Sequence, residues 1–210
     1  MKSAESRPGP GRPRAFDPER ALDAALAVFW QHGYEGASLP ALTAAMGINR
    51  PSLYAAFGNK EQTFKLAVDR YAKIDMAYAQ VALSASTAFE VASRYLHDNV
   101  EAVTTPGKPP GCLSIQGGLS SAPDTDPIVK YLADRRADGE QQFARRFERS
   151  KQEGDLAADE DAADLARYVS TVSTGIAVQA ASGAARDDLH RVVDRALRVF
   201  PHPTNSSAPR

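Results

Sequence analysis

Apolar residues recur at helical spacing along most of this chain. In the first third they fall every three or four positions, at Leu22, Ala25, Leu26 and Phe29. This spacing indicates a helix with one buried face. Asp17 followed by Pro18 predicts where that helix starts, and Gly33 predicts its end in a left-handed cap.

Capping residues delimit three more helices in the same region. The signals are Ser38 with Gly47, Asn49 with Gly58, and Asn59 with Gln62 in a capping-box arrangement. The third helix contains Pro51, which is tolerated because the amides of the first turn have no intrahelical partner. The fourth helix has few breakers and is predicted to run to about residue 83.

The remainder of the chain is also helical in pattern. Helices are predicted at 88–103, 112–121, 127–152, 160–182 and 188–200. No stretch alternates convincingly at period two, and no internal repeat is visible. The predicted fold is therefore all-α, with a three-helix head and a body of about six helices.

Composition and helix pattern together divide the chain into five parts. We expect a disordered basic arm at 1–15, a helix-turn-helix DNA-binding domain at 16–58 and a connecting helix at 59–83. A ligand-binding and dimerisation body follows at 84–201, and a disordered tail at 202–210.

Charge is unevenly distributed along the 210 residues. The net charge is −1, but residues 1–75 hold ten Lys/Arg against eight Asp/Glu, which hints at an anionic partner for the front of the chain. No apolar run is long enough to span a membrane, and no signal peptide is visible. The one cysteine fits a reducing compartment. We therefore expect a cytoplasmic protein.

The stretch INRPSLYAAFGNK, residues 48–60, is too short and too polar for ordinary core. A short helix, a glycine-containing turn and a second short helix make a helix-turn-helix, whose second helix enters the major groove of DNA. Arg50, Pro51 and Ser52 lie at that helix's N-terminus, facing base edges. Arg50 can donate two hydrogen bonds to guanine. Tyr54 faces outward, where its hydroxyl can reach a phosphate.

Two further positions suggest phosphate contacts. Lys60 lies in the first turn of the fourth helix, where the helix dipole already disfavours a cation, and a DNA phosphate nearby would compensate it. Ser38 offers a matching site at the start of the second helix. Taken singly, Tyr54 as a packing residue or Lys60 as a solvated charge would also explain these residues. Their joint order and spacing favour DNA binding.

From Phe16 to Tyr71 the sequence resembles the TetR family of bacterial transcriptional regulators. The resemblance rests on ALAVFWQHGYEGASLPALTAAMGINRPSLYAAFGNKEQTF. It implies a three-helix DNA-binding head and an all-α body that dimerises and usually binds an inducer, with repression as the default. It also implies phosphate roles for Ser38, Tyr54 and Lys60. Ala55 and Ala56 depart from the family, whose members often carry larger side chains there, so this helix is expected to recognise few bases and to depend on DNA shape.

The arm contains the sequence GRPR, with Arg12 and Arg14. An extended Arg-Pro-Arg segment fits the narrow minor groove of A·T tracts. The same residues could also form only a solvated basic tail.

A protein that recognises two half-sites needs a two-fold interface. The last two predicted helices suit it, because one is apolar or small nearly all round and the other has one apolar face. The predicted interface residues are Val172, Ile176, Leu189, Val193, Leu197 and Phe200. Packing within one chain is the alternative interpretation.

The inducer site is less defined, and its candidate lining residues are Tyr78, Tyr95, Cys112, Gln116, Tyr131, Phe143 and Phe147. Any of the aromatic residues could instead be core. No arginine or acidic cluster indicates a charged inducer. Cys112, which follows a proline and a glycine and is predicted to begin a short helix, could be a reactive thiol or an inert buried one. The GCL sequence resembles that of a subset of TetR-family regulators, some of which sense electrophiles or oxidants through this cysteine.

Other chemistry has little support. The four histidines lack metal-ligand spacing, and no phosphate-binding loop or nucleophile elbow occurs. We expect no metal, no cofactor and no enzyme activity. The predicted function is a homodimeric repressor that a small-molecule inducer releases from a palindromic operator in double-stranded DNA. The alternatives are a thiol-based sensor acting through Cys112 and a helical adaptor that binds proteins rather than DNA.

Overall fold

The computed structural model describes residues 16–116 and 127–200. Within these ranges all the regular secondary structure is helical, as predicted. The helices are α1 Pro18–Gly36, α2 Leu39–Met46, α3 Arg50–Phe57, α4 Lys60–Ile74, α5 Ala77–Leu83, α6 Ala88–Val103, α7 Leu113–Gln116, α8 Pro127–Gln152, α9 Ala162–Ala181, α10 Arg186–Ala196 and the short 3-10 helix η1 Leu197–Val199. The predictions for the arm (1–15, with Arg12 and Arg14) and for the tail (202–210) concern residues outside the described ranges.

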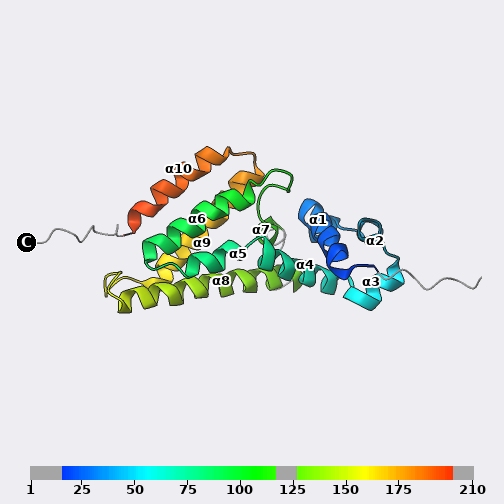
Figure 1. Cartoon of the computed structure of the whole chain (residues 1–210), viewed down its shortest axis with the longest axis horizontal. Helices are drawn as coiled ribbons and strands as arrows, with labels where there is room; N and C mark the ends of the chain where they lie inside the picture. The colour runs from blue at the N-terminus through cyan, green and yellow to red at the C-terminus, as the bar shows by residue number, and fades with distance from the viewer. Residues whose placement is uncertain (1–15, 117–126, 201–210) are drawn as a thin grey trace, which may run out of the picture.

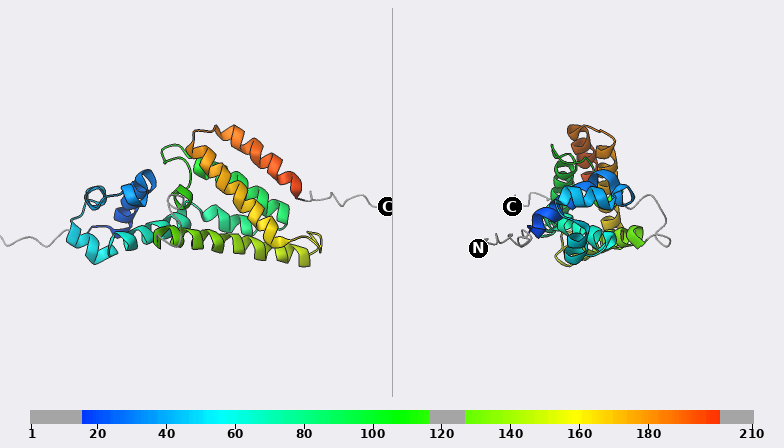
Figure 2. Two further views of the ribbon diagram at one scale, coloured as in Figure 1. Left: turned by 180° about the vertical axis from the view of Figure 1, so that it is seen from behind. Right: turned by 90° about the vertical axis from the view of Figure 1, so that its right-hand side faces the viewer.

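The molecule is elongated (Figure 1). Helices α1 to α3 form a compact head at one end, and α4 runs from the head toward the body. The body is built from α5 to α10, with α6, α8 and α9 side by side along its length (Figure 2). Of the described helices, none is long and apolar enough to cross a membrane.

The predicted side-chain caps of the head are present, but α1 does not end at Gly33: it is kinked there and continues to Gly36. Ser38 Oγ accepts from the Ala41 amide at 3.2 Å, and Asn49 Oδ1 accepts from the Ser52 amide at 2.8 Å. These bonds satisfy amides that have no intrahelical partner at a helix start. At Gly47, φ is 67°, a left-handed conformation that favours glycine. The starts of both short helices and the end of α2 are therefore set by residues adjacent to them in the sequence.

Three fully buried side chains hold the head together: Phe29 of α1, Leu42 of α2 and Leu53 of α3. Phe29 also meets Phe64 of α4 edge-on, with 5.0 Å between ring centroids. Burial of a side chain of this size stabilises a fold by about 1.5–3 kcal/mol. The start of α4 is thus part of the head's core.

The predicted fourth helix is wrong in one respect, because it is broken near its middle. Helix α4 ends at Ile74, and α5 starts at Ala77 after a short turn. The amides of Asp75 and Met76 both donate to the Tyr71 carbonyl, and the Asp75 carboxylate pairs with Lys108 from the loop after α6. This long-range ion pair holds the turn, and α5 packs on α6 instead of continuing the axis of α4.

The body helices follow the predicted ranges closely. Helices α6 and α8 match at both ends, and α9 is shorter than predicted by two residues at its start and one at its end. Helix α10 starts two residues earlier than predicted and ends at Ala196, four residues early, where η1 follows it to Val199. Of the predicted helix at 112–121, the structure describes α7 at 113–116, and residues 117–121 lie outside the described residues. The body core includes Leu96, Leu132, Phe147 and Ile176, all essentially without exposure.

Candidate DNA-binding surface and effector pocket

Helix α3 divides into a buried face and an exposed face. Leu53 and Phe57 are buried in the head, while Arg50, Pro51 and Tyr54 are exposed and Ser52 is half-buried. Tyr54 is 49% exposed, which is more than expected if its role were only to pack against the core. Every predicted base-facing or phosphate-facing residue of this helix is therefore accessible, and the helix is held by its opposite face.

Lys60 is oriented by an aromatic ring. Its ammonium lies 4.4 Å from the centroid of the Tyr34 ring, which is itself packed against Phe29 and Phe64. A cation over a ring face is attracted to it by about 0.5–1 kcal/mol at such a site. Among the described residues, neither Lys60 nor Arg50 has a carboxylate within ion-pair distance. Both positive charges remain available to an anionic partner.

A second feature is a cavity of about 350 Å³ in the body. Side chains from α4 to α9 line it, so it lies where the connecting helix meets the body. Its volume is at the low end of the range typical of small-molecule sites. Three predicted residues line this cavity: Tyr95, Cys112 and Phe143.

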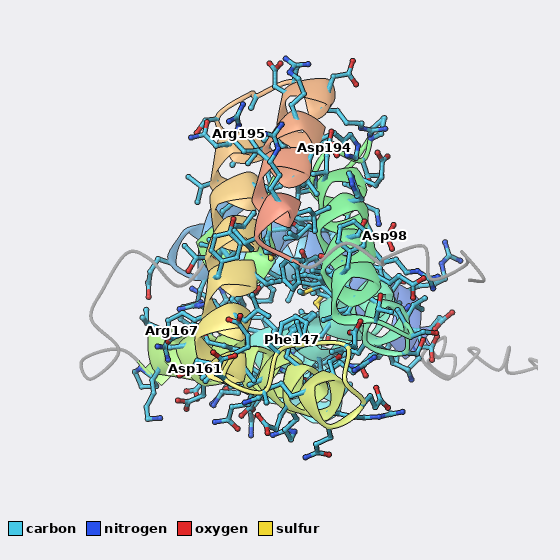
Figure 3. The ribbon with its side chains drawn as sticks, turned by 90° about the vertical axis from the view of Figure 1, so that its left-hand side faces the viewer. Asp98, Phe147, Asp161, Arg167, Asp194 and Arg195 are labelled. Carbon is cyan, nitrogen blue, oxygen red and sulfur yellow. The ribbon has the colours of Figure 1, made fainter. Side chains whose placement is uncertain are left out.

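The other four predicted pocket residues lie elsewhere. Phe147 is fully buried core, and in Figure 3 it points into the interior of the body. Tyr131 donates to Asp69 at 3.1 Å, and Gln116 donates to the Pro110 carbonyl at 3.2 Å. Tyr78 does not line the cavity, but its hydroxyl accepts a hydrogen bond from Asn99, and Asn99 does line it. The presence of an aromatic side chain in the sequence therefore did not distinguish residues that line the cavity from residues of the hydrophobic core.

Cys112 lies in a wall of the cavity and is 4% exposed. The Tyr71 hydroxyl donates to its sulfur at 3.3 Å, and Ser114 Oγ lies 3.0 Å from the same atom. Burial raises the pKa of Tyr71 well above its ordinary value, and the nearby Cys112 adds to the effect. Tyr71 therefore stays protonated and acts as a hydrogen-bond donor. The cysteine directly precedes α7, as the sequence indicated.

Sequence reasoning missed several polar residues of the pocket. Tyr95 and Ser173 share a hydrogen bond of 3.1 Å between α6 and α9. Asn99 lies on the buried stripe of α6, where a polar residue among Leu96, Val100 and Val103 was an available signal. Arg136 of the charged helix α8 also lines the cavity. The sequence shows no arginine cluster that indicates a charged inducer, but folding brings two adjacent arginines of α8, Arg135 and Arg136, to the cavity wall.

The cavity is physically joined to the head. Tyr71, which lines the cavity, packs edge-on against Trp30 of α1, with 4.8 Å between ring centroids. Trp30 and Tyr71 are both buried. A change at the cavity wall therefore has a direct contact route to the first helix of the head.

Five of the six predicted dimer-interface residues are core of a single subunit. Ile176, Leu189, Val193, Leu197 and Phe200 are each at most 5% exposed, because α10 and η1 lay their apolar face on α6, α9 and Phe147. Only Val172 is half-buried. The prediction took the apolar face of α10 for an intersubunit seam, and the structure uses that face within the chain.

The histidines are less scattered than the sequence indicated. His97 of α6 and His190 of α10 stack, with 2.9 Å between their Nδ1 atoms. Burial, followed by the neighbouring His190, lowers the pKa of His97, while Asp194, Asp98 and Glu101 act in the opposite direction. In the described part of the chain, no group of three or more potential ligands could hold a metal ion.

A head with an exposed recognition helix, joined to an all-helical body, defines a helix-turn-helix transcriptional regulator. The family model described as bacterial regulatory proteins, tetR family, matches residues 21–66. Over 193 residues the chain is 32% identical to the HTH-type transcriptional repressor ComR of Escherichia coli (strain K12), covering 91% of this chain and 92% of ComR. The chain belongs to the tetR family.

Other relatives agree with this assignment. The HTH-type transcriptional repressor BdcR of Escherichia coli (strain K12) is 29% identical over 182 residues, 86% of this chain and 87% of BdcR. A solved structure of a cysteine mutant of the TetR-family regulator CifR, complexed with a 26-bp double-strand operator DNA, is 42% identical. It superimposes with a TM-score of 0.85 over 90% of this chain and 100% of that one.

Proposed function

We propose that this protein is a homodimeric repressor, released from a palindromic operator when a small molecule enters the body cavity. The observation that carries the proposal is the exposed face of α3, together with Arg50 and Lys60, which have no carboxylate at ion-pair distance among the described residues. A rigid element with accessible donors is what recognition of base edges and phosphates requires. CifR, the relative solved with operator DNA, supports this use of the head.

Each head residue has a defined role in this proposal. Arg50 pairs with guanine, Pro51 and Ser52 face the groove, and Tyr54, Lys60 and Ser38 hold phosphates. Ala55 and Ala56 are exposed and offer only methyl groups. Base-specific contacts are therefore few, and sequence-dependent DNA shape supplies part of the specificity.

The dimer seam in this proposal uses the outer faces of α9 and α10. Val178, Val192 and Val199 are 40%, 50% and 57% exposed. Gly175 and Thr171 lie on the same outer side of α9, and such small side chains permit close helix approach. On α10, Arg195 lies on the outside of the body (Figure 3). This face replaces the apolar face that the sequence suggested.

The inducer acts through Tyr71 and Trp30. A ligand that moves Tyr71 changes its contact with Trp30 and hence the position of α1 relative to the body. Such a ligand shifts the spacing of the two heads only if it binds one arrangement better than the other.

Selection from random duplex DNA with the purified protein, at two salt concentrations, tests the proposed function. We expect a palindromic consensus whose affinity falls steeply with salt, because phosphate contacts release counterions. Selection of a single half-site would refute the two-fold arrangement. No enrichment after refolding to strip bound ligand would refute DNA binding and favour a protein-binding adaptor.

Sensing through Cys112 is a second candidate for the signal. The observation that favours it is the position of the sulfur in the cavity wall with two hydroxyl neighbours, Tyr71 and Ser114. Alkylation with N-ethylmaleimide should then weaken DNA binding by the natural protein and leave the Cys112→Ser variant unaffected. Unchanged DNA affinity after complete alkylation would exclude this signal.

A further inference from the structure

We propose that the cavity takes a small organic monocarboxylate that also carries a hydrogen-bond donor, with the carboxylate on Arg136 and the donor on the side-chain oxygen of Asn99. The inference rests on the proposed function, since it names the chemical class of the inducer. It is carried by two polar groups of the cavity wall whose bonding capacity is unfilled.

Arg136 is the first of these groups. Its guanidinium is half-buried, and burial lowers its pKa from the ordinary value. It donates to the Ser114 carbonyl at 2.6 Å, but no carboxylate within the described residues lies at ion-pair distance. Burying an unpaired charge is costly, so a site of this kind gains from an anionic partner. A planar guanidinium suits a carboxylate in particular, because two parallel N–H donors match its two oxygens.

Within the described part of the chain, the neighbouring Arg135, unlike Arg136, already has a carboxylate partner. The two residues are adjacent on α8, and both line the cavity. Arg135 is already paired with Asp69 at 3.0 Å and lies over the Tyr131 ring. Its charge is therefore compensated by the protein, and of the two arginines it is Arg136 that has no carboxylate partner among the described residues.

Asn99 is the second group. It is 3% exposed, and its Nδ2 donates to the Tyr78 hydroxyl at 2.9 Å. Its Oδ1 has no hydrogen-bond partner, although the residue lines the cavity. A buried carbonyl oxygen without a donor costs about 1–3 kcal/mol. A ligand hydroxyl or N–H at this position removes that cost.

The remaining lining limits the ligand further. Tyr95, Phe143 and Ile115 supply apolar walls, which suit an aromatic or aliphatic body. Two carboxylates, Asp138 and Glu140, also line the cavity, and Glu140 is bound to Arg167 at 3.4 Å. With one uncompensated cation and two acidic neighbours, the site favours a single negative charge over two. A monocarboxylate meets this condition better than a phosphate.

Isothermal titration calorimetry on the unsubstituted protein tests the proposal without any DNA. The probes are 4-hydroxyphenyl-substituted acetate, propanoate and butanoate, with the methyl ester and the deoxy (phenyl) form of whichever binds best. We expect at least one acid to bind, and its ester to bind about tenfold or more weakly because a charge-assisted bond is lost. The deoxy form should lose about threefold to tenfold, as expected for one neutral hydrogen bond. Fluorescence of Trp30, the single tryptophan, provides a second readout because it contacts Tyr71.

Variants assign the effects to residues. Arg136→Gln should abolish the preference for acid over ester, whereas Arg135→Gln, the same charge change one position earlier, should preserve it. Asn99→Leu should abolish the preference for the hydroxylated probe over the deoxy form. Thermal midpoints of the three variants show that each is folded, and the comparison of probes on the natural protein does not depend on any variant.

Three results would overturn the proposal: no acid of the series binds, the ester binds as tightly as the acid, or Arg136→Gln retains the acid preference. None of these outcomes bears on DNA binding, which the selection experiment measures separately. A protein that selects a palindrome but ignores these acids retains the proposed function and loses this inference.

Discussion

The head and the body of this protein differ in how their sites are made. The DNA-binding surface lies on the short helices α2 and α3 and the first residue of α4, and its caps, turns and exposed residues fall within residues 38–60. The cavity draws its lining from six helices and two of the connections between them, spread from Val68 to Thr174. A site made from one continuous segment follows from local rules, whereas a site made from distant segments depends on how helices pack. The first can be predicted from sequence, and the second requires coordinates.

Loss of a fully buried aromatic ring in the head should have the largest effect on stability. It tests whether DNA binding by the exposed face of the head requires an intact core beneath it. Phe29→Ala removes a side chain with no exposure that packs against Tyr34 and Phe64. We expect a loss of about 3–5 kcal/mol in unfolding free energy, with a matching loss of DNA binding. Urea denaturation followed by circular dichroism measures it. Tyr54→Phe, at an exposed position, should stay within about 0.5 kcal/mol of the natural protein; an equal loss in both would contradict the division of faces.

The outcome of the sequence predictions follows the same difference. Ser38, Asn49 and Asn59 were identified as caps because a cap is a property of four consecutive residues, and their bonds are present. The break after Ile74 was missed because Lys108, 33 residues beyond Asp75, holds it. Leu189 and Val193 were assigned to a dimer seam because an apolar helix face does not state which surface covers it.

For the pocket, residue type was a poor guide and unfilled bonding capacity was a better one. Phe147 and Tyr95 look alike in sequence, yet one is core and the other lines the cavity. Asn99 and Arg136 stand out only when their partners are counted in three dimensions.

Removal of the recognition arginine should have the next largest effect and tests whether the head alone carries specificity. Arg50→Ala should lose about 1–3 kcal/mol of discrimination at one base pair in each half-site, because the bidentate pair to guanine is lost. Competition binding with single-base operator variants, at fixed salt, measures this. Arg94→Ala removes the same charge from an exposed position on α6 in the body and should change nothing. A uniform loss across all sequences would assign Arg50 to a phosphate instead.

The contact between the two regions predicts a smaller effect. Tyr71→Phe keeps the ring that packs on Trp30 but removes the hydroxyl that donates to Cys112. We expect a stability loss of about 0.5–1.5 kcal/mol and a weaker inducer response, with DNA affinity in the absence of inducer within about twofold. Operator binding titrated with inducer separates these quantities. An unaltered inducer response would show that the coupling bypasses this hydroxyl.

The smallest predicted effect concerns pH and the seam between α6 and α10. Because the pKa of His97 is lowered in the folded protein, the unfolded chain takes up its proton first as the pH falls. Stability should therefore be highest above the ordinary histidine value of about 6.5 and decrease as the pH drops below it. His190→Gln removes the neighbouring imidazole and should flatten part of this dependence, leaving the part due to burial. Thermal midpoints between pH 5 and 8 measure both, and since His97 is 34% exposed the slope should be shallow. A midpoint that rises on acidification would mean that Asp194, Asp98 and Glu101 outweigh burial, so that these carboxylates govern the seam.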